Sequence, residues 1–135
     1  MSESRSHIEL VQVAKNYIID SIPEEYSIFV QMHSADTQRP QVLESFIPDV
    51  FVEIPDLLMI GEAKTINDFD REHSKAQFDV YLNKCDSFHG ESCLVISVPW
   101  QIVPSAKNYF RRIKKRREYT MDIAIINELG EVAMV

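Results

Sequence analysis

The sequence predicts a single α/β domain, residues 1–135, in which a mixed central β-sheet is flanked by helices. Helix-like and strand-like segments alternate along the chain, which is typical of this class. With 135 residues and 45% hydrophobic content, the chain can form one core without disulfides or metals. The expected strands are residues 26–32, 48–54, 57–64 and 93–100, and a terminal pair that begins at residue 122.

The first expected helix covers residues 6–20. Ser6 is the expected N-cap, and Glu9 follows three residues later, which is a capping-box pattern. Its expected apolar stripe comprises Ile8, Val11, Ala14 or Lys15, and Ile18. Beyond Pro23 we expect the strand at 26–32 and then a polar loop at 33–41.

A β-hairpin is expected next, formed by Pro48 to Ile54 and Leu57 to Lys64 around the turn Pro55-Asp56. With the turn centred there, the numbers of paired residues sum to 111, so Asp49 lies opposite Glu62. Asp56 would lie on the order of 20 Å from Glu62, at ~3.3 Å per residue, and is excluded as a ligand.

This register predicts a metal site. Lys64 points to the same face as Glu62, because strand side chains alternate with a period of two. Two opposed carboxylates, Asp49 and Glu62, destabilise a sheet, and a divalent cation between them would remove the repulsion. Oxygen ligands suit Mg²⁺ or Mn²⁺.

The next expected helix begins at Asn67 or Asp68 and ends near Lys84. His73, Gln77 and Tyr81 recur at i, i+4 and i+8 and share one of its faces. The continuous apolar run at residues 93–100 is typical of a central strand that is covered on both faces. Asp122 to Glu128, a turn at Gly130 and the last residues form the terminal strand pair.

A strongly basic helix is expected from Pro104 or Ser105 to about Tyr119, with Tyr109, Phe110 and Ile113 facing inward. Residues 107–117 carry seven of the fourteen basic residues and no acid, whereas residues 1–106 have a net charge of −10. A localised phosphate contact is one interpretation, and a solvated helix face is the other. The expected phosphate-binding residues are Lys107, Arg111, Arg112, Lys114 and Lys115.

Pro48-Asp49, followed after twelve residues by Glu62-Ala63-Lys64, resembles the signature of PD-(D/E)XK nucleases. Gln77 to Tyr81 resembles the Q-h-x-x-Y motif of RecB-like members. The order of expected elements is similar to the αβββαβ core of that superfamily, which is the restriction-endonuclease-like fold. The small VRR-NUC and resolvase-type members are the most similar.

The resemblance implies a Mg²⁺- or Mn²⁺-dependent endonuclease, a hydrolase that cleaves nucleic acid, with DNA as the expected substrate. It implies metal ligation by Asp49, Glu62 and the Ala63 backbone carbonyl, with Glu9 as an additional ligand. Lys64 and Gln77 would be catalytic, and Tyr81 and the basic helix would hold the nucleic acid. Two alternatives remain for single residues: Glu9 completes the capping box, and Gln77 and Tyr81 pack at the edge of a helix.

Two other functions are compatible with the sequence: a non-catalytic nucleic-acid-binding or assembly subunit that keeps the fold, and a structural or protein-interaction domain. A glycine-rich phosphate loop is excluded, since no such pattern occurs. The sequence has neither a secretory signal nor a membrane-spanning run, so we expect a cytoplasmic protein with reduced Cys85 and Cys93. A homodimer or a partner protein would supply specificity.

Overall fold

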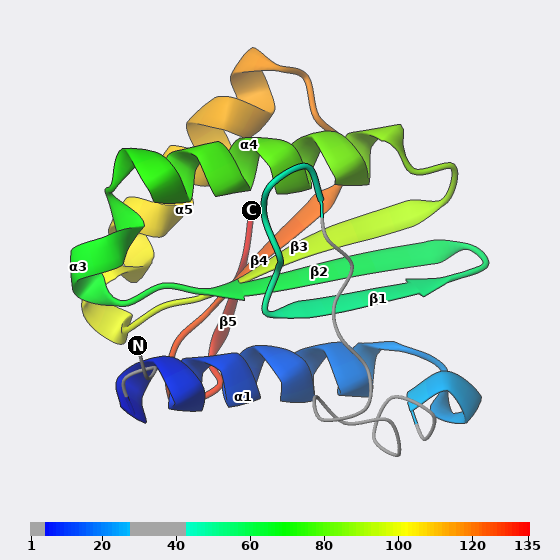
Figure 1. Ribbon diagram of the computed structural model, residues 1–135, viewed down its shortest axis with the longest axis horizontal. Helices are drawn as coiled ribbons and strands as arrows, with labels where there is room; N and C mark the ends of the chain where they lie inside the picture. Colours follow the sequence, from blue (N-terminus) through cyan, green and yellow to red (C-terminus); the bar gives the residue numbers. More distant parts are fainter. Residues whose placement is uncertain (1–4, 28–42) are drawn as a thin grey trace.

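The computed structural model describes residues 5–27 and 43–135. It confirms an α/β fold, in which a mixed five-stranded sheet with the order β1-β2-β3-β4-β5 is flanked by helices (Figure 1). The elements are α1 (Arg5–Ser21), β1 (Val50–Ile54), β2 (Leu57–Ala63), α3 (Ile66–Phe69), α4 (Glu72–Ser87), β3 (Glu91–Ser97), η1 (Trp100–Ile102), α5 (Val103–Arg116), β4 (Asp122–Ile126) and β5 (Val132–Met134).

The sheet separates α1 from the other long helices. Strands β2, β3 and β4 are parallel, and α4 and α5 form the two crossovers between them, on the same face of the sheet (Figure 1). Strands β1 and β5 pair antiparallel at the two edges. In a parallel sheet covered on both faces, the central strands are apolar throughout, as the run at 93–100 predicted.

The β1–β2 hairpin has the predicted register. Val50 pairs with Gly61 and Ile54 with Leu57, so paired numbers sum to 111 around the Pro55-Asp56 turn. β1 begins at Val50, two residues later than expected, and β2 ends at Ala63. The alternation of side chains along β2 therefore directs Glu62 toward α4, together with Leu58 and Ile60 of the same strand.

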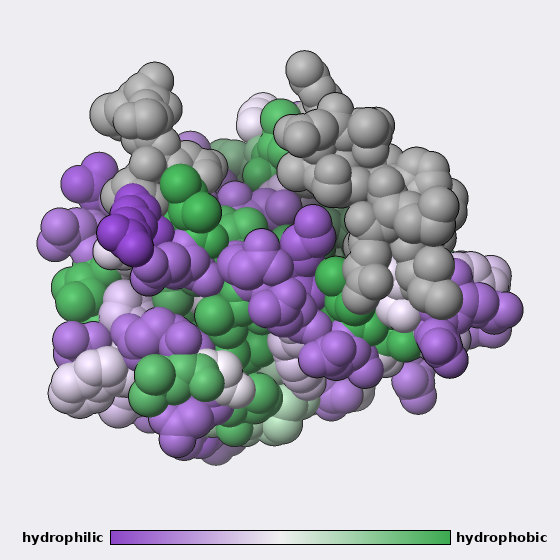
Figure 2. Space-filling model, turned by 90° about the horizontal axis from the view of Figure 1, so that it is seen from below, coloured by the Kyte–Doolittle hydropathy of each residue, from purple (hydrophilic) through white to green (hydrophobic). Residues whose placement is uncertain are grey.

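A close contact holds α1 against this hairpin. A Cβ atom added to Gly61 would lie 3.0 Å from Ile18 Cδ1 and 3.2 Å from Val50 Cβ. Ile18 and Ala14 of α1 pack on β1, β2, β3 and β4 in the core on this side of the sheet. Seen from outside, the face that carries α1 has hydrophilic side chains with separate hydrophobic patches (Figure 2).

The helix α1 lies where it was predicted, but its N-cap was predicted wrongly and its buried stripe only in part correctly. Arg5 is already helical, so Ser6 lies within the helix and is not its N-cap. Ile8 is 53% exposed. The buried residues are Leu10, Ala14 and Ile18, so the expected stripe is confirmed at Ala14 and Ile18 and is wrong at Ile8, in whose place Leu10 is buried.

Two helices replace the single one expected after Lys64. The short α3 ends at Phe69, and Arg71 is extended, with φ −71° and ψ 148°, before α4 begins at Glu72. The Asp68 carbonyl accepts a hydrogen bond from Ser74 Oγ at 2.6 Å and one from the Arg71 N–H at 3.2 Å, which fixes the angle between the two helices.

Other expectations had mixed outcomes. Most of the strand expected at 26–32 and the loop at 33–41 lie outside the described residues, while Tyr26 and Ser27 end a helical turn. The basic helix and the terminal strand pair are confirmed. Cys85 and Cys93 are buried and free. Within residues 5–27 and 43–135, no helix has the length and apolar character needed to cross a membrane.

Candidate functional site

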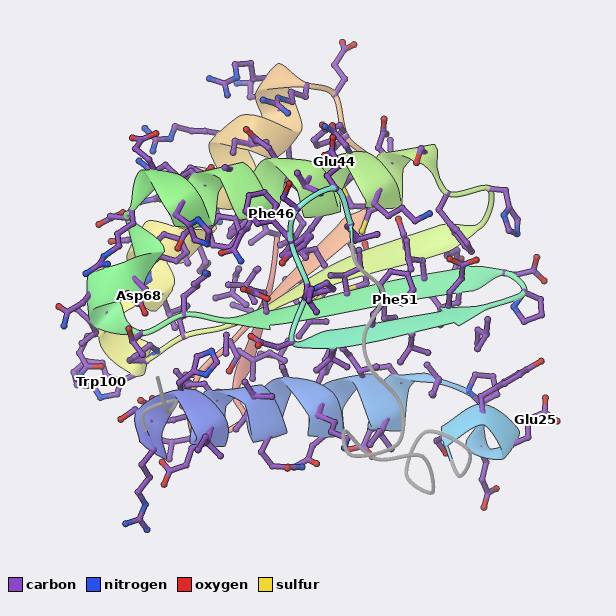
Figure 3. The ribbon with its side chains drawn as sticks, in the orientation of Figure 1. Glu25, Glu44, Phe46, Phe51, Asp68 and Trp100 are labelled. Atoms are coloured by element: carbon purple, nitrogen blue, oxygen red, sulfur yellow. The ribbon has the colours of Figure 1, made fainter. Side chains whose placement is uncertain are left out.

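The candidate site lies at the carboxyl end of β2. In sheets with parallel strands, ligands bind beyond the carboxyl ends of the strands. Here the chain leaves β2 through Lys64 and enters α3, whose Asp68 lies at the same end of the molecule as Trp100 (Figure 3). The Lys64 N–H donates a hydrogen bond of 3.0 Å to the Ser97 carbonyl, so the sheet pairing with β3 extends to this residue.

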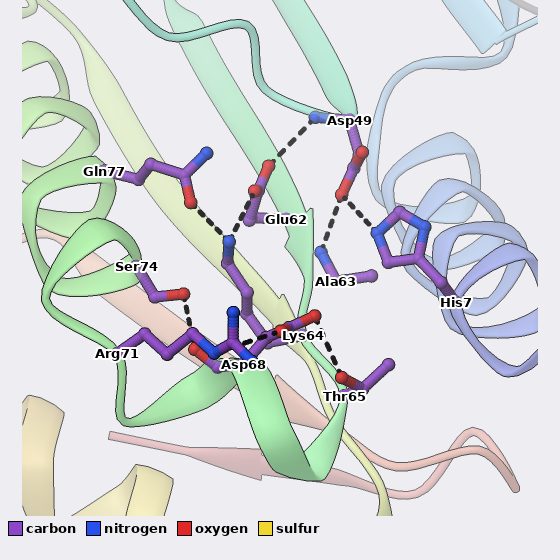
Figure 4. A network of polar contacts seen from close by, with 10 residues as sticks. All are labelled: His7, Asp49, Glu62, Ala63, Lys64, Thr65, Asp68, Arg71, Ser74 and Gln77. Atoms are coloured by element: carbon purple, nitrogen blue, oxygen red, sulfur yellow. Dashed lines mark hydrogen bonds and ion pairs between the residues drawn. The ribbon is translucent and has the colours of Figure 1, made fainter. Parts of the chain in front are cut away.

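The hairpin register brings the two carboxylates together through backbone hydrogen bonds. The Asp49 N–H donates to Glu62 Oε1 at 3.1 Å. The Ala63 N–H donates to Asp49 Oδ2 at 2.9 Å (Figure 4). Each carboxylate is therefore fixed by the strand opposite it, as two residues that face each other across a hairpin would be.

Lys64 joins the carboxylate pair to α4. Its ammonium lies 3.4 Å from Glu62 Oε2 and donates a hydrogen bond to Gln77 Oε1 (Figure 4). Gln77 comes from the middle of α4, and its side chain is buried. The structure thus brings Asp49, Glu62, Lys64 and Gln77 into one network, as the sequence predicted from the hairpin and the helix spacing.

The surroundings of Glu62 disfavour the negative charge of its carboxylate. Burial and, next, the neighbouring Asp49 carboxylate raise the pKa of Glu62, and Lys64 lowers it, so that it lies at about 8. Glu62 is only 4% exposed. Its ion pair with Lys64 therefore does not offset desolvation and the repulsion from Asp49, and the carboxyl group stays partly protonated near neutral pH.

His7 is a member of the site that the sequence interpretation missed. Its Nε2 lies 3.6 Å from Asp49 Oδ2 (Figure 4). The helical spacing of the sequence could have indicated His7. The buried residues Leu10, Ala14 and Ile18 define a face of α1, and this face continues back to position 7 at the spacing i, i+3, i+7. The stripe expected from the sequence began at Ile8 and therefore left out His7.

Glu9 is separated from this network. Its side chain is 63% exposed and pairs with Arg5, one turn earlier, at 3.3 Å. The α1 residue that the structure places beside Asp49 is His7.

Tyr81 does not lie where a nucleic-acid contact requires it. It is fully buried, so the expected direct contact is wrong in this conformation. Burial raises the pKa of its hydroxyl, and so do the charges of Glu62 and Asp49, which places it behind the network. His73, on the same helix, is exposed, and its ring packs edge-on against Phe46 with 5.4 Å between centroids.

The donor set fits a hard divalent cation with few protein ligands. Among the described residues, no three His, Cys, Asp or Glu side chains form a metal-binding group. Mg²⁺ is commonly bound through one or two carboxylates, with water and substrate phosphate completing its octahedron. Asp49 and the partly protonated Glu62 suit that chemistry, because a cation between them would offset the repulsion that raises the pKa of Glu62.

The basic helix is α5, and its cations differ in their surroundings. Arg111, Arg112 and Lys115 are exposed, and Lys107 is half-buried. Lys114 Nζ donates a hydrogen bond of 2.9 Å to the Val135 carbonyl. Lys114 is therefore held by Val135, and the phosphate contact expected of it stays a prediction.

Comparison with known proteins returned no match to a family model, to a curated protein or to a solved structure. The resemblance to PD-(D/E)XK nucleases therefore remains a prediction from the residues themselves.

Proposed function

We propose that this protein is a divalent-metal-dependent nuclease that hydrolyses phosphodiester bonds of nucleic acid, with DNA as the expected substrate. The observation that carries the proposal is the buried network at the end of β2, in which two carboxylates and one ammonium converge. The raised pKa of Glu62 supports it, because evolved sites tolerate such a charge imbalance where chemistry needs it.

Asp49, Glu62 and the Ala63 carbonyl would hold the ion. A bound Mg²⁺ or Mn²⁺ acidifies a water molecule and neutralises charge that develops on the phosphate. Asp49 is fixed for this task by the Ala63 N–H, and Glu62 by the Asp49 N–H. His7, 3.6 Å from Asp49, limits the directions in which that carboxylate can turn.

Lys64 would stabilise the phosphate oxygens as negative charge builds on them and would orient the attacking water. Gln77 holds the ammonium through its side-chain oxygen, so Lys64 is positioned before substrate arrives. Preorganised charge of this kind acts mainly on the transition state, so Lys64→Met should lower kcat by about 10²–10³-fold and change substrate binding much less.

A non-catalytic nucleic-acid-binding subunit is the second candidate, and one observation favours it. The side chains of Glu62 and Lys64 are only 5% and 10% exposed and are bonded to each other. A buried polar network of this kind can also serve the uniqueness of a fold. In that case metal would not be needed for binding.

The test is cleavage of linear duplex, single strand, flap, four-way junction and RNA, each with Mg²⁺, Mn²⁺ or EDTA. Glu62→Gln should lower cleavage at least about 100-fold, because it removes a ligand and keeps the shape of the side chain. Glu53→Gln is the matched control, since Glu53 is an exposed residue of β1 in the same hairpin.

Thermal unfolding of the same proteins separates the two candidates. A metal ion at 100 times its Kd should raise the free energy of unfolding by about 2.7 kcal/mol in the wild type and the control, and not in Glu62→Gln. If nucleic-acid binding persists in EDTA, with no cleavage and no stabilisation by metal, the nuclease function is contradicted and the binding-subunit function is supported.

A further inference from the structure

A cleft of about 560 Å³ lies between the α3–α4 connection and α5, apart from the site at the end of β2. Phe69 and Tyr109 contribute its aromatic lining, and Lys75, Arg111 and Arg112 contribute charge. Lys75 precedes Gln77 by two residues on α4. At 100° per residue the two side chains point to opposite sides of the helix, so the cleft and the candidate site flank α4.

Within the described residues, the cations of this cleft form no ion pairs with carboxylates. The side chains of Lys75, Arg111 and Arg112 form no ion pair and donate no hydrogen bond to a partner within residues 5–27 and 43–135. Arg117 of the same basic segment, by contrast, pairs with Asp79 at 3.5 Å. Lys75 Nζ lies 5.9 Å from the centroid of the Tyr109 ring, which orients the ammonium and leaves its charge available.

The neutral donors Ser105 and Asn108 complete the lining. Ser105, Asn108 and Arg112 recur at i, i+3 and i+7 and therefore lie along one face of α5. A hydroxyl, an amide and a guanidinium in a row can all donate hydrogen bonds to oxygen atoms of one anion. The single carboxylate of the lining is Asp70, so three cations leave two positive charges in excess.

We propose that this cleft binds a phosphate monoester. The excess of two positive charges matches a monoester, which carries about −1.5 to −2 at pH 7, better than an internal phosphodiester with its single charge. Two guanidinium groups and an ammonium are the groups that recognise phosphate in proteins. The monoester is the terminal phosphate of a nucleic-acid strand or that of a free nucleotide; only the first source rests on the proposed nuclease function.

The first experiment measures binding of dAMP and of deoxyadenosine by isothermal titration, with EDTA present so that no metal site contributes. We expect dAMP to bind and deoxyadenosine not to bind. Lys75→Ala and Arg112→Ala should each weaken dAMP about ten-fold. Lys84→Ala is the matched control: it removes the same charge from the same helix, nine residues or about two and a half turns beyond Lys75, and should leave dAMP binding unchanged.

The second experiment distinguishes the sources by anisotropy of labelled oligonucleotides with phosphate or hydroxyl ends, again in EDTA. Tighter binding of phosphorylated ends than of dAMP, lost in Lys75→Ala, assigns the cleft to strand ends. Stronger binding of dAMP assigns it to free nucleotides. If phosphate and hydroxyl ends bind equally and dAMP does not bind, the proposal is overturned, whatever the cleavage assay shows for Glu62→Gln.

Discussion

Strands β2 and β4 of the same sheet both end near buried polar residues, Glu62 and Asn127. The two residues differ in how well their neighbours satisfy their hydrogen bonds and charge. Beyond β4, Asn127 is 8% exposed and organises the turn to β5. Its Oδ1 accepts hydrogen bonds from the N–H groups of Leu129 and Glu131, at 2.9 and 3.0 Å, and its Nδ2 donates to Glu131 Oε1 at 2.9 Å. Gly130, with φ +82°, completes the turn.

At the end of β2 the polar groups do not balance in this way. Glu62 and Asp49 are two acids beside the ammonium of Lys64 and the imidazole of His7. The pKa of Glu62 still rises to about 8, because burial and Asp49 both disfavour its charge. The Asn127 network satisfies the backbone of a turn, whereas the Glu62 network concentrates charge where no turn requires it. The balanced partners of Asn127 indicate a structural role, and the disfavoured charge of Glu62 is the feature on which the proposed metal site rests.

Asn127→Ala should produce the largest change in stability. It leaves two N–H groups without their acceptor and should lower the free energy of unfolding by about 2 kcal/mol. The loss should be the same with and without Mg²⁺, as measured by thermal or urea unfolding. Leu129→Ala, at a 77% exposed position of the same turn, is the control and should change stability by less than about 0.5 kcal/mol. A metal-dependent loss would contradict the structural role of Asn127.

Glu62→Gln should have a smaller and opposite effect in metal-free buffer. The pKa of Glu62 is about 8 in the folded protein and 4.5 for the free side chain, so the folded state binds the proton more tightly. The contribution of Glu62 to stability is thus fully present below about pH 4.5 and is lost as the pH rises through about 8. Gln copies the protonated form and should be about 1–2 kcal/mol more stable than wild type at pH 8.5, with little difference at pH 4.5.

Unfolding of the wild type and of Glu62→Gln in EDTA across this pH range measures the difference. If the free energies of unfolding of the two proteins change in parallel with pH, ionisation of Glu62 does not destabilise the fold. Glu62 would then not differ from Asn127 in this respect. Glu53→Gln, the exposed change in the same hairpin, controls for the general loss of one acid.

Glu9→Ala should have the smallest effect. Its ion pair with Arg5 is exposed and one turn apart, so we expect a loss below about 0.5 kcal/mol. The midpoint of Mg²⁺ or Mn²⁺ stabilisation should not move. The same titration on His7→Gln should shift that midpoint, because His7 contacts Asp49. A shift with Glu9→Ala would restore the ligand role that the sequence suggested for Glu9.

The sequence predicted the features that depend on local chemistry. The turn at Pro55-Asp56 determines the register, and the register places Asp49 beside Glu62. The spacing after Lys64 placed Gln77 on the helix that faces the sheet, where it holds Lys64. Each of these steps uses residues close together in the chain, for which periodicity and turn preference are informative.

Features that depend on packing were predicted less well. In α1 the expected stripe began at Ile8, whereas the structure buries Leu10 and leaves Ile8 53% exposed. The packing of the first turns of α1 on the sheet places His7 beside Asp49, and sequence spacing did not determine it. The break between α3 and α4 contains neither Pro nor Gly, so hydrogen bonds to the Asp68 carbonyl, formed only in the folded chain, determine it. Tyr81 has the spacing of a surface contact, but its position beneath Glu62 follows from how α4 lies on the sheet.

The two-residue connection between β1 and β2 has a consequence for the order in which the chain assembles. A hairpin closed by so short a loop forms in roughly 1–10 μs, whereas the parallel pairing of β2 with β3 first requires closure of the 27 residues from Lys64 to Gly90. Asp49 and Glu62 would then meet in the folding chain before α4 covers them, while water still screens their repulsion. We therefore expect the repulsion between Asp49 and Glu62 to slow the later docking of α4 on the sheet. The rate at which the β1–β2 hairpin forms should not change.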